Sequence, residues 1–494
     1  MSAPPAFETL KTKLAEIHDL TKAGALLAWD QQTIMPPRGA DARADQLGTL
    51  GKLAHQSFIS DEIGTLLEEL RPYEESLDRD SFEASLIRVA RRDFEKSVRV
   101  PPELSAEIIR TGSRAFEVWV EARANSDFET FRPWLEQLVE LKHRYVECFP
   151  EADESYDTLL DDYEQGMKTA QVRSIFARLK EVLVPLVDAA ASGATPPVTG
   201  TFPAEKQRRL SLEIVRRFGF DDTAWRLDTA PHPFAQSLAT SDIRITTREP
   251  EHSLDGLFAA MHECGHGLYE HGVDPVYERT LLARGASLGL HESQSRLWEN
   301  LVGRSRPFWS WFYPRLQEVF PGELDQVDEE TWFRSINDIS PGLIRIEADE
   351  ASYNLHIILR FELEQQIMDG LDLRELPDVW NEMMDRYLGV DVPDDARGVL
   401  QDVHWSRGGF GYFPTYSLGN VYSVQIWERL RDDVDDVDEQ IARGEFGAIR
   451  EWLRENLHRH GRKYLPAEML ERAVGGPVDP EPYLRYLQGK LAAA

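Results

Sequence analysis

The stretch AMHECGHGLYEHG, residues 260–272, places two histidines four positions apart, with a glutamate directly after the first. Apolar residues recur every three or four positions across residues 253–271, which predicts one amphipathic helix. Residues four apart lie on the same face of a helix, so the imidazoles of His262 and His266 can converge on one ion. Glu263 is predicted to lie beside that ion as a proton acceptor. This pattern is typical of zinc-dependent hydrolysis.

The third metal ligand has to come from outside this motif. A catalytic zinc ion usually keeps three protein ligands and one open position for water. In one known class of zinc site the third ligand is a histidine six residues after the second motif histidine, with a glycine three residues after that motif histidine. Tyr269 stands here at the glycine position and Gly272 at the histidine position, so this class is excluded. A glutamate on a later helix is the other solution, and the predicted helix 285–303 offers Glu292 and Glu299. Position alone favours Glu292 and leaves Glu299 open.

The fold class predicted from the whole chain is mainly α, with a small sheet beside the histidine helix. Helical periodicity marks residues 6–22, 102–123, 130–147, 171–190 and 204–218. The best strand signal is SDIRITT, residues 241–247, because two isoleucines alternate there with polar residues.

Single residues predict where several helices start and stop. Ser253 is expected to cap the histidine helix through its hydroxyl. Pro101-Pro102 and Ser340-Pro341 are expected to start helices, since proline is tolerated in the first turn. Gly370 is expected to end one, because glycine readily adopts the left-handed conformation found there.

A single catalytic unit, residues 1–494, is predicted. Its clearest loop is ASGATPPVTGTFP, residues 191–203, which is rich in turn-forming residues. This loop is expected to separate a helical lobe, about residues 1–190, from a metal-bearing lobe, about residues 204–494.

Charge and cysteine content limit the possible partners. The chain has 55 Lys and Arg and 86 Asp and Glu, which gives a formal net charge of −31. This charge argues against nucleic acid or an anionic membrane as a partner. Only 11 of the basic residues are lysines, a composition that suits a halophilic host, although an ordinary acidic protein is the simpler alternative. No apolar run reaches the ~18 residues of a spanning helix. The N-terminus shows no secretory signal, and two cysteines indicate no disulfide framework, so a cytoplasmic location is expected.

The chain resembles the carboxypeptidase Taq family of zinc metallocarboxypeptidases over essentially its whole length. The motifs that carry the resemblance are LAWDQQTIMPP (27–37), HPF (232–234), DIRIT (242–246), HECGH (262–266), HESQ (291–294), IRIEAD (344–349), GVLQDVHW (398–405) and GYFPTY (411–416). The resemblance implies that Glu292 is the third ligand and that one ion, Zn²⁺ or alternatively Co²⁺, is bound per chain. It implies an elongated helical fold with a deep central groove, usually a homodimer. It also implies removal of single C-terminal residues from peptides, with broad side-chain tolerance and poor cleavage at proline.

Roles for further residues follow from the chemistry of peptide hydrolysis. Glu263 is expected to accept a proton from the attacking water and to deliver it to the leaving amine. Tyr416 is expected to donate a hydrogen bond to the oxyanion, with His404 and Tyr412 behind it. All three lie in the aromatic stretch 404–416, for which a merely packed loop is the alternative.

Recognition of a free C-terminus calls for a fixed cation. A planar guanidinium matches the two oxygens of a carboxylate, and the resemblance, through the IRIEAD motif, implies Arg345 for this role; the alternative is that Arg345 only pairs with Asp349. Arg244 is the competing candidate, with Asp242 as an orienting neighbour. His291 is left open between a structural and a functional role.

Two other functions use the same residues. A zinc oligopeptidase that cuts internal bonds would need the same three metal ligands, and the products distinguish it from a carboxypeptidase. A non-catalytic helical scaffold with a metal site is the other alternative, but Glu263 argues against it because a structural site needs no base.

Overall fold

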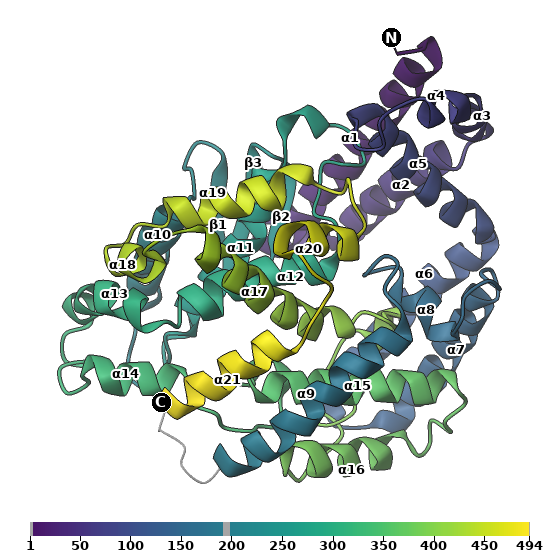
Figure 1. The fold of residues 1–494 in the computed structure, drawn as a ribbon. Coiled ribbons are helices and arrows are strands. Elements are labelled where there is room, and N and C mark those ends of the chain that lie inside the picture. Colours follow the sequence, from purple (N-terminus) through teal and green to yellow (C-terminus); the bar gives the residue numbers. More distant parts are fainter. Residues whose placement is uncertain (1–2, 191–197, 494) are drawn as a thin grey trace. The chain divides into compact units, whose positions relative to one another are not determined.

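The structure of the protein, a computed structural model, describes residues 3–190 and 198–493 (Figure 1). Helices dominate these residues, and their regular β structure is a three-stranded sheet. The predicted fold class, mainly α with a small sheet, is confirmed. The chain divides into two compact units, and each unit is built from three stretches of sequence.

Unit 1 comprises Met1–Val98, Val198–Trp332 and Ile426–Pro477. Its helices are α1 (Pro5–Thr33), α2 (Ala40–Phe58), α3 (Asp61–Glu69), α4 (Arg71–Glu75), nearly all of α5 (Phe82–Arg99), α10 (Ala204–Phe218), α11 (Asp255–Gly272), α12 (Leu288–Arg296), α13 (Arg306–Val319), α18 (Val437–Ala442), α19 (Gly447–Asn456) and α20 (Pro466–Val474). Its strands are β1 (Trp225–Thr229), β2 (Ala235–Ala239) and β3 (Asp242–Thr247).

Unit 2 comprises Arg99–Pro197, Phe333–Gln425 and Val478–Ala494. Its helices are α6 (Pro102–Asn125), α7 (Phe128–Val146), α8 (Ser155–Leu160), α9 (Thr169–Ala190), α15 (Ser352–Met368), α16 (Leu376–Leu388) and α21 (Glu481–Ala493). The residues of α14 (Glu329–Ile336) and α17 (Pro414–Asp433) are divided between the two units.

The sheet of unit 1 has the strand order β1-β3-β2, with β3 parallel to β1 and antiparallel to β2. The predicted strand 241–247 is β3, and its Ile243 and Ile245 are fully buried. Helix α11 packs against this sheet at Gly267, where a Cβ atom would overlap the Trp225 ring of β1. Because a glycine stands there, the histidine helix can lie directly on the sheet.

Most predicted helices are present close to their expected bounds. Residues 102–123, 130–147, 171–190 and 204–218 correspond to α6, α7, α9 and α10, and α1 continues beyond its predicted end to Thr33. Helix α6 starts at Pro102, and Gly370 follows α15 with a φ of 99°, so both of these predicted helix ends are confirmed.

Two predicted helix starts are wrong. The histidine helix begins at Asp255, and the Ser253 hydroxyl donates to the Asp255 carboxylate instead of capping a backbone N–H. No helix begins at Ser340-Pro341, where proline is followed by Gly342, which favours a turn over a helix. Helix α15 begins only at Ser352.

The helix predicted over residues 285–303 is shorter and changes type. It begins at Leu288, where Ser287 caps it by accepting from the Leu290 N–H, and it is α-helical to Arg296. Residues Leu297–Val302 then form a π-helical turn. Such turns insert an extra residue per turn and change which side chains share a face, often at functional sites.

The predicted loop 191–203 is only partly within the described residues. Residues 198–203 form neither helix nor strand, whereas residues 191–197 lie outside the described part of the chain. The division into a helical lobe and a metal-bearing lobe of one catalytic unit stays a prediction.

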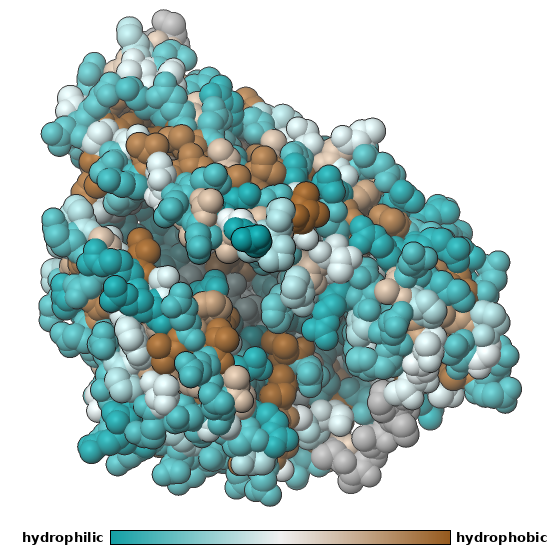
Figure 2. All heavy atoms as spheres, turned by 180° about the vertical axis from the view of Figure 1, so that it is seen from behind, coloured by the Kyte–Doolittle hydropathy of each residue, from teal (hydrophilic) through white to brown (hydrophobic). Residues whose placement is uncertain are grey.

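The chain is hydrophilic on average, and so is the face of the molecule that one view shows. Hydrophilic residues cover most of the face shown in Figure 2, and the mean hydropathy is −0.43. No helix within the described residues is both long enough and apolar enough to cross a membrane.

Candidate functional site

Helices α11 and α12 bring three of the predicted metal ligands together within unit 1. The Nε2 atoms of His262 and His266 each lie 3.6 Å from Oε2 of Glu292, and one ligand atom from each residue lies within 4.8 Å of the others. Tetrahedral zinc, with bonds of about 2.0–2.1 Å, separates its ligand atoms by roughly 3.4 Å. Two imidazoles and one carboxylate at this spacing fit a divalent metal ion.

The second nitrogen of each imidazole has a partner that fixes its tautomer. Nδ1 of His262 lies 2.9 Å from the Glu299 carboxylate and donates to it. Nδ1 of His266 lies 2.6 Å from Nδ1 of His291, whose Nε2 lies 2.9 Å from the Glu270 carboxylate. A carboxylate only accepts, so His291 donates through Nε2 and accepts through Nδ1. In the neutral imidazoles the hydrogen of His262 and of His266 therefore lies on Nδ1, and Nε2 is the nitrogen that can bind a metal.

His291, which the sequence left open, thus connects His266 to Glu270. Partners of this kind orient a metal-binding imidazole and typically contribute 10–100-fold to metal affinity. We expect His291→Ala to raise the dissociation constant for zinc by about 10–100-fold, measured by competition with a chromophoric chelator.

His271→Ala is the matched control for that variant. His271 also lies on α11, but its Nδ1 donates to the Thr240 carbonyl, away from the metal ligands. The His271→Ala variant should bind zinc as tightly as the parent does. Equal zinc affinity of the His291→Ala variant and the parent would show that His291 does not orient His266.

Glu299, the alternative third ligand, faces the opposite edge of the His262 ring. The π-helical turn Leu297–Val302 carries it there, one turn beyond the helix that carries Glu292. Burial alone would raise the pKa of Glu299, but Arg296, His262 and Arg304 hold that pKa well below its usual range. The geometry places Glu299 as an ionised hydrogen-bond acceptor for His262.

Close packing of α11 on α12 sets the position of Glu292. A Cβ atom on Gly265 would lie 2.6 Å from the Gln294 carbonyl oxygen and 2.6 Å from the Ser295 Cα. Glycine at the centre of the HECGH motif therefore permits the helices to approach. Oε1 of Glu292 accepts a hydrogen bond from Arg296 Nε at 2.7 Å, and Oε2 of Glu292 is the oxygen nearest the imidazoles.

Glu263 lies on the same helix as the two histidines and is 6% exposed. Its Oε2 atom has no hydrogen-bond partner among the residues that the structure describes. Burial raises the pKa of Glu263 to about 7, and the charge of Glu292 adds to this effect. Cys264 beside it is fully buried, and burial raises the pKa of its thiol, as expected for an inert thiol.

Four further predicted residues, Arg345, His404, Tyr412 and Tyr416, form a cluster in unit 2. Nε2 of His404 lies 3.3 Å from the Tyr416 hydroxyl, and the His404 ring centre lies 5.1 Å from that of Tyr412. The Arg345 guanidinium carbon lies 5.1 Å from the centre of the Tyr416 ring. Unit 2 therefore brings together all four of its predicted site residues.

Arg345 pairs with Asp402 and not with Asp349. Its Nε and Nη2 donate to Asp402 Oδ1 at 2.9 and 2.7 Å, and its Nη1 donates to the Tyr353 hydroxyl at 3.1 Å. Asp349 instead accepts from the backbone N–H of Ser352 at the start of α15. A guanidinium has five N–H donors, so one N–H remains on each terminal nitrogen of Arg345.

Asp402 is a residue that the sequence reasoning missed. It accepts from Arg345 and also from Arg360 Nε at 2.6 Å, so one carboxylate holds two buried cations. Its position two residues before His404, within GVLQDVHW, was the available signal. Burial lowers the pKa of His404 to about 4 against the pull of Asp402, so this imidazole is neutral at pH 7.

Arg244, the competing candidate for carboxylate binding, lies on β3 in unit 1. Its Nε and Nη2 donate to the two oxygens of Asp242, each at 3.0 Å. Its guanidinium carbon also lies 4.5 Å from the Trp29 ring centre. Asp242 therefore orients Arg244, and it occupies the side of the guanidinium that would otherwise receive a carboxylate in two hydrogen bonds.

Known proteins resemble this chain over its full length. The carboxypeptidase Taq (M32) metallopeptidase family matches residues 9–491. Thermostable carboxypeptidase 1 of Thermus thermophilus is 39% identical over 100% of this chain and 99% of its own length. Carboxypeptidase 1 of Bacillus subtilis is 37% identical over 97% and 96% of the two chains. The crystal structure of an M32 carboxypeptidase from Deinococcus radiodurans superposes with a TM-score of 0.95, at 39% identity and 99% coverage of both chains.

Proposed function

Because this chain belongs to the carboxypeptidase Taq (M32) metallopeptidase family, and is thus a metal-dependent hydrolase acting on peptides, we propose that it is a zinc carboxypeptidase. It releases single amino acids from the C-terminus of peptides. The observation that carries the proposal is the convergence of Nε2 of His262, Nε2 of His266 and one carboxylate oxygen of Glu292 beside the buried Glu263.

The proposed metal is one Zn²⁺ per chain, held by His262, His266 and Glu292. Two nitrogen ligands and one oxygen ligand suit zinc, and Co²⁺ accepts a similar set. When bound, such an ion supplies Lewis-acid chemistry, which polarises a peptide carbonyl and makes water more acidic.

The proton-transfer step belongs to Glu263. This carboxylate takes a proton from the attacking water and gives it to the leaving amine, so that the amine departs neutral. Its unpartnered Oε2 leaves one oxygen available for that proton. Tyr416 is the proposed donor to the oxyanion and His404 its partner, a role supported by their contact in unit 2 and by the neutral state of His404.

Arg345 is the proposed ligand of the substrate's C-terminal carboxylate. Asp402 and Tyr353 fix the guanidinium and leave one N–H on each of its terminal nitrogens, which suits two parallel hydrogen bonds to a carboxylate. Tyr412 is proposed to contact the substrate from the same cluster. Arg244 is the second candidate for this role and is weakened by its pairing with Asp242.

Further properties of the proposal rest on the family resemblance and on composition. They are a broad tolerance for the C-terminal side chain, poor cleavage at proline and a homodimeric state. A cytoplasmic location is supported by two free cysteines, Cys148 and Cys264. A halophilic host is supported by the net charge of −31, and activity that persists at about 1 M KCl, where screening is nearly complete, would test it.

The products of one peptide test the proposed function. We expect a mass-spectrometric time course on an unblocked ten-residue peptide to show stepwise loss of single C-terminal residues. Excess chelator should abolish this loss and added zinc should restore it, because the metal ligands bind a removable ion. The same peptide with an amidated C-terminus is the matched control and should be cut much more slowly. Internal fragments would identify an oligopeptidase, and an uncut peptide with metal bound would identify a scaffold.

A further inference from the structure

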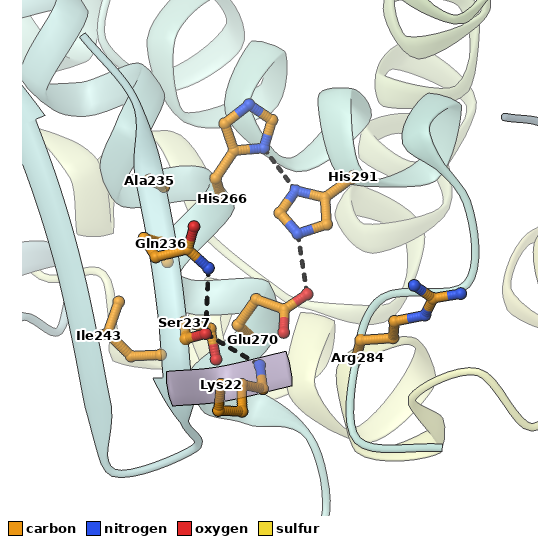
Figure 3. A pocket seen from close by; sticks show the side chains of 10 residues that line it. Lys22, Ala235, Gln236, Ser237, Ile243, His266, Glu270, Arg284 and His291 are labelled. Carbon is orange, nitrogen blue, oxygen red and sulfur yellow. Dashed lines mark hydrogen bonds and ion pairs between the residues drawn. The ribbon is translucent and has the colours of Figure 1, made fainter. Parts of the chain in front are cut away.

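A pocket of about 210 Å³ opens beside the metal centre within unit 1 (Figure 3). Helices α1, α11 and α12, strands β2 and β3, and the segment that precedes α12 contribute to it. The lining side chains that matter here are Lys22, Ser237, His266, Glu270, Arg284 and His291. We name this space the Lys22–Arg284 pocket. Since His266 forms part of its wall, a group inside the pocket lies next to the proposed metal site.

Two cations of this pocket lack an anionic partner among the described residues. Lys22 Nζ donates to the Ser237 carbonyl oxygen at 2.8 Å, and no carboxylate lies within ion-pair distance of it. The Arg284 guanidinium makes neither a hydrogen bond nor an ion pair with any residue that the structure describes, and it is exposed. In Figure 3 no dashed line reaches Arg284. Both cations therefore retain donors for a ligand.

The only carboxylate in the pocket wall is already engaged. Glu270 Oε1 accepts from His291 Nε2 and from the Gly285 N–H, each at 2.9 Å. Glu270 is thus committed to holding the imidazole behind His266. The pocket keeps one net positive charge, in a protein whose formal net charge is −31.

Lys22 is partly buried, and a partly buried cation without an anionic partner costs free energy because water solvates it only in part, whereas Arg284 is exposed. Burial lowers the pKa of Lys22, although Glu270 and Glu278 oppose this effect. The repulsion of Arg462 lowers the pKa of Arg284 to about 10, so Arg284 remains charged at pH 7. Arg462 cannot neutralise this excess, because it is itself a cation and is paired with Asp93. An anion in the pocket would stabilise both groups.

We propose that the Lys22–Arg284 pocket binds a carboxylate group of the peptide substrate. This inference rests on the proposed function. Carboxylates are the anionic groups of an unmodified peptide, and they occur at its C-terminus and in the side chains of Asp and Glu. The Lys22 ammonium and the Arg284 guanidinium supply charge-assisted hydrogen bonds. The apolar wall, formed by Ala235 and Ile243, suits the methylene groups that carry such a carboxylate.

The test measures binding of four peptides to the zinc-loaded Glu263→Gln variant by calorimetry, so that no turnover intervenes. The probes are Ala-Ala-Glu and Ala-Ala-Gln, each with a free and with an amidated C-terminus. We expect the protein to bind the carboxylate-bearing member of at least one pair about tenfold more tightly, which corresponds to about 1.4 kcal/mol. Adding Lys22→Met or Arg284→Met should remove most of that preference.

The four probes distinguish the two sources of the carboxylate. If a pocket variant no longer prefers Ala-Ala-Glu over Ala-Ala-Gln, the pocket binds an acidic side chain. If it no longer prefers the free over the amidated peptide, the pocket binds the C-terminus. Lys13→Met is the matched control, because Lys13 lies on the same helix α1 but pairs with Glu62 on the surface. The Lys13→Met variant should keep every preference of the parent for a carboxylate-bearing peptide.

Unchanged preferences in both pocket variants, or no carboxylate preference in the parent, would overturn the proposal. Arg284 is exposed, so Arg284→Met tests the pocket even where Lys22→Met fails to fold. The proposed function is judged separately, by the products that the unmodified enzyme releases. Stepwise release of single residues together with unchanged preferences would reject the pocket alone.

Discussion

Glu263→Gln is expected to bind zinc as the parent does and to hydrolyse peptides at least about 10³-fold more slowly. The change keeps the size of the side chain but removes the carboxylate that we propose as the proton acceptor. Glu263 is buried, and its Oε2 has no hydrogen-bond partner among the described residues, so the amide breaks no bond seen in the structure. The measurement pairs kcat on an unblocked peptide with zinc content per chain.

Cys264→Ala is the matched control for this prediction. Cys264 is the next residue of the same helix and is fully buried, but successive helical residues differ by about 100° and its thiol is not part of the metal site. It should keep both zinc and turnover within a few-fold of the parent. A Glu263→Gln enzyme whose turnover stays within tenfold of the parent would exclude Glu263 as the base.

Glu292→Ala is expected to weaken zinc binding by more than about 100-fold, because Glu292 is the proposed third ligand of the ion. Glu299→Ala removes only the acceptor of His262 Nδ1, so the loss should stay within the 10–100-fold typical of such partners. Both affinities can be measured by competition with a chromophoric chelator. The two glutamates lie on the same stretch of chain, which makes each the control for the other.

The variant that loses more zinc affinity identifies which glutamate is the third ligand. A larger loss for Glu299→Ala than for Glu292→Ala would move the ligand role to Glu299. Equal and small losses would mean that neither carboxylate holds the ion.

Local periodicity predicted much of the fold. The histidine helix and strand β3 follow from patterns that a few consecutive residues carry, so both lie close to their predicted positions. Strands β1 and β2 were missed because each has only five residues: Trp225 and Leu227 of β1 alternate with polar residues only over this short run, and β2 (AQSLA) shows no alternation. The start at Ser340-Pro341 was wrong because proline favours a first turn but cannot by itself continue a helix through Gly342.

In the candidate site, too, only the residues that share one helix could be predicted from local spacing. The two histidines and Glu263 were found because one helix carries them at a fixed spacing. Position alone could not separate Glu292 from Glu299, because the change from α-helix to π-helix between them has no clear sequence signal.

Two other partners were also missed, one on the histidine helix α11 itself and one far along the chain. Glu270 reaches the site through His291, and Asp402 reaches Arg345 from 57 residues away. Gly265 was the overlooked signal: a glycine inside a histidine motif indicates close approach of another backbone, and here that backbone belongs to the helix that carries Glu292.

Anomalous X-ray diffraction at the zinc edge, from crystals of the zinc-loaded protein, tests the metal centre most directly. The expected result is one peak per chain, about 2.0–2.2 Å from Nε2 of His262, Nε2 of His266 and an oxygen of Glu292. A peak bound by Glu299 in place of Glu292, a fourth protein ligand that closes the water position, or no peak at these residues would contradict the proposed catalytic zinc site.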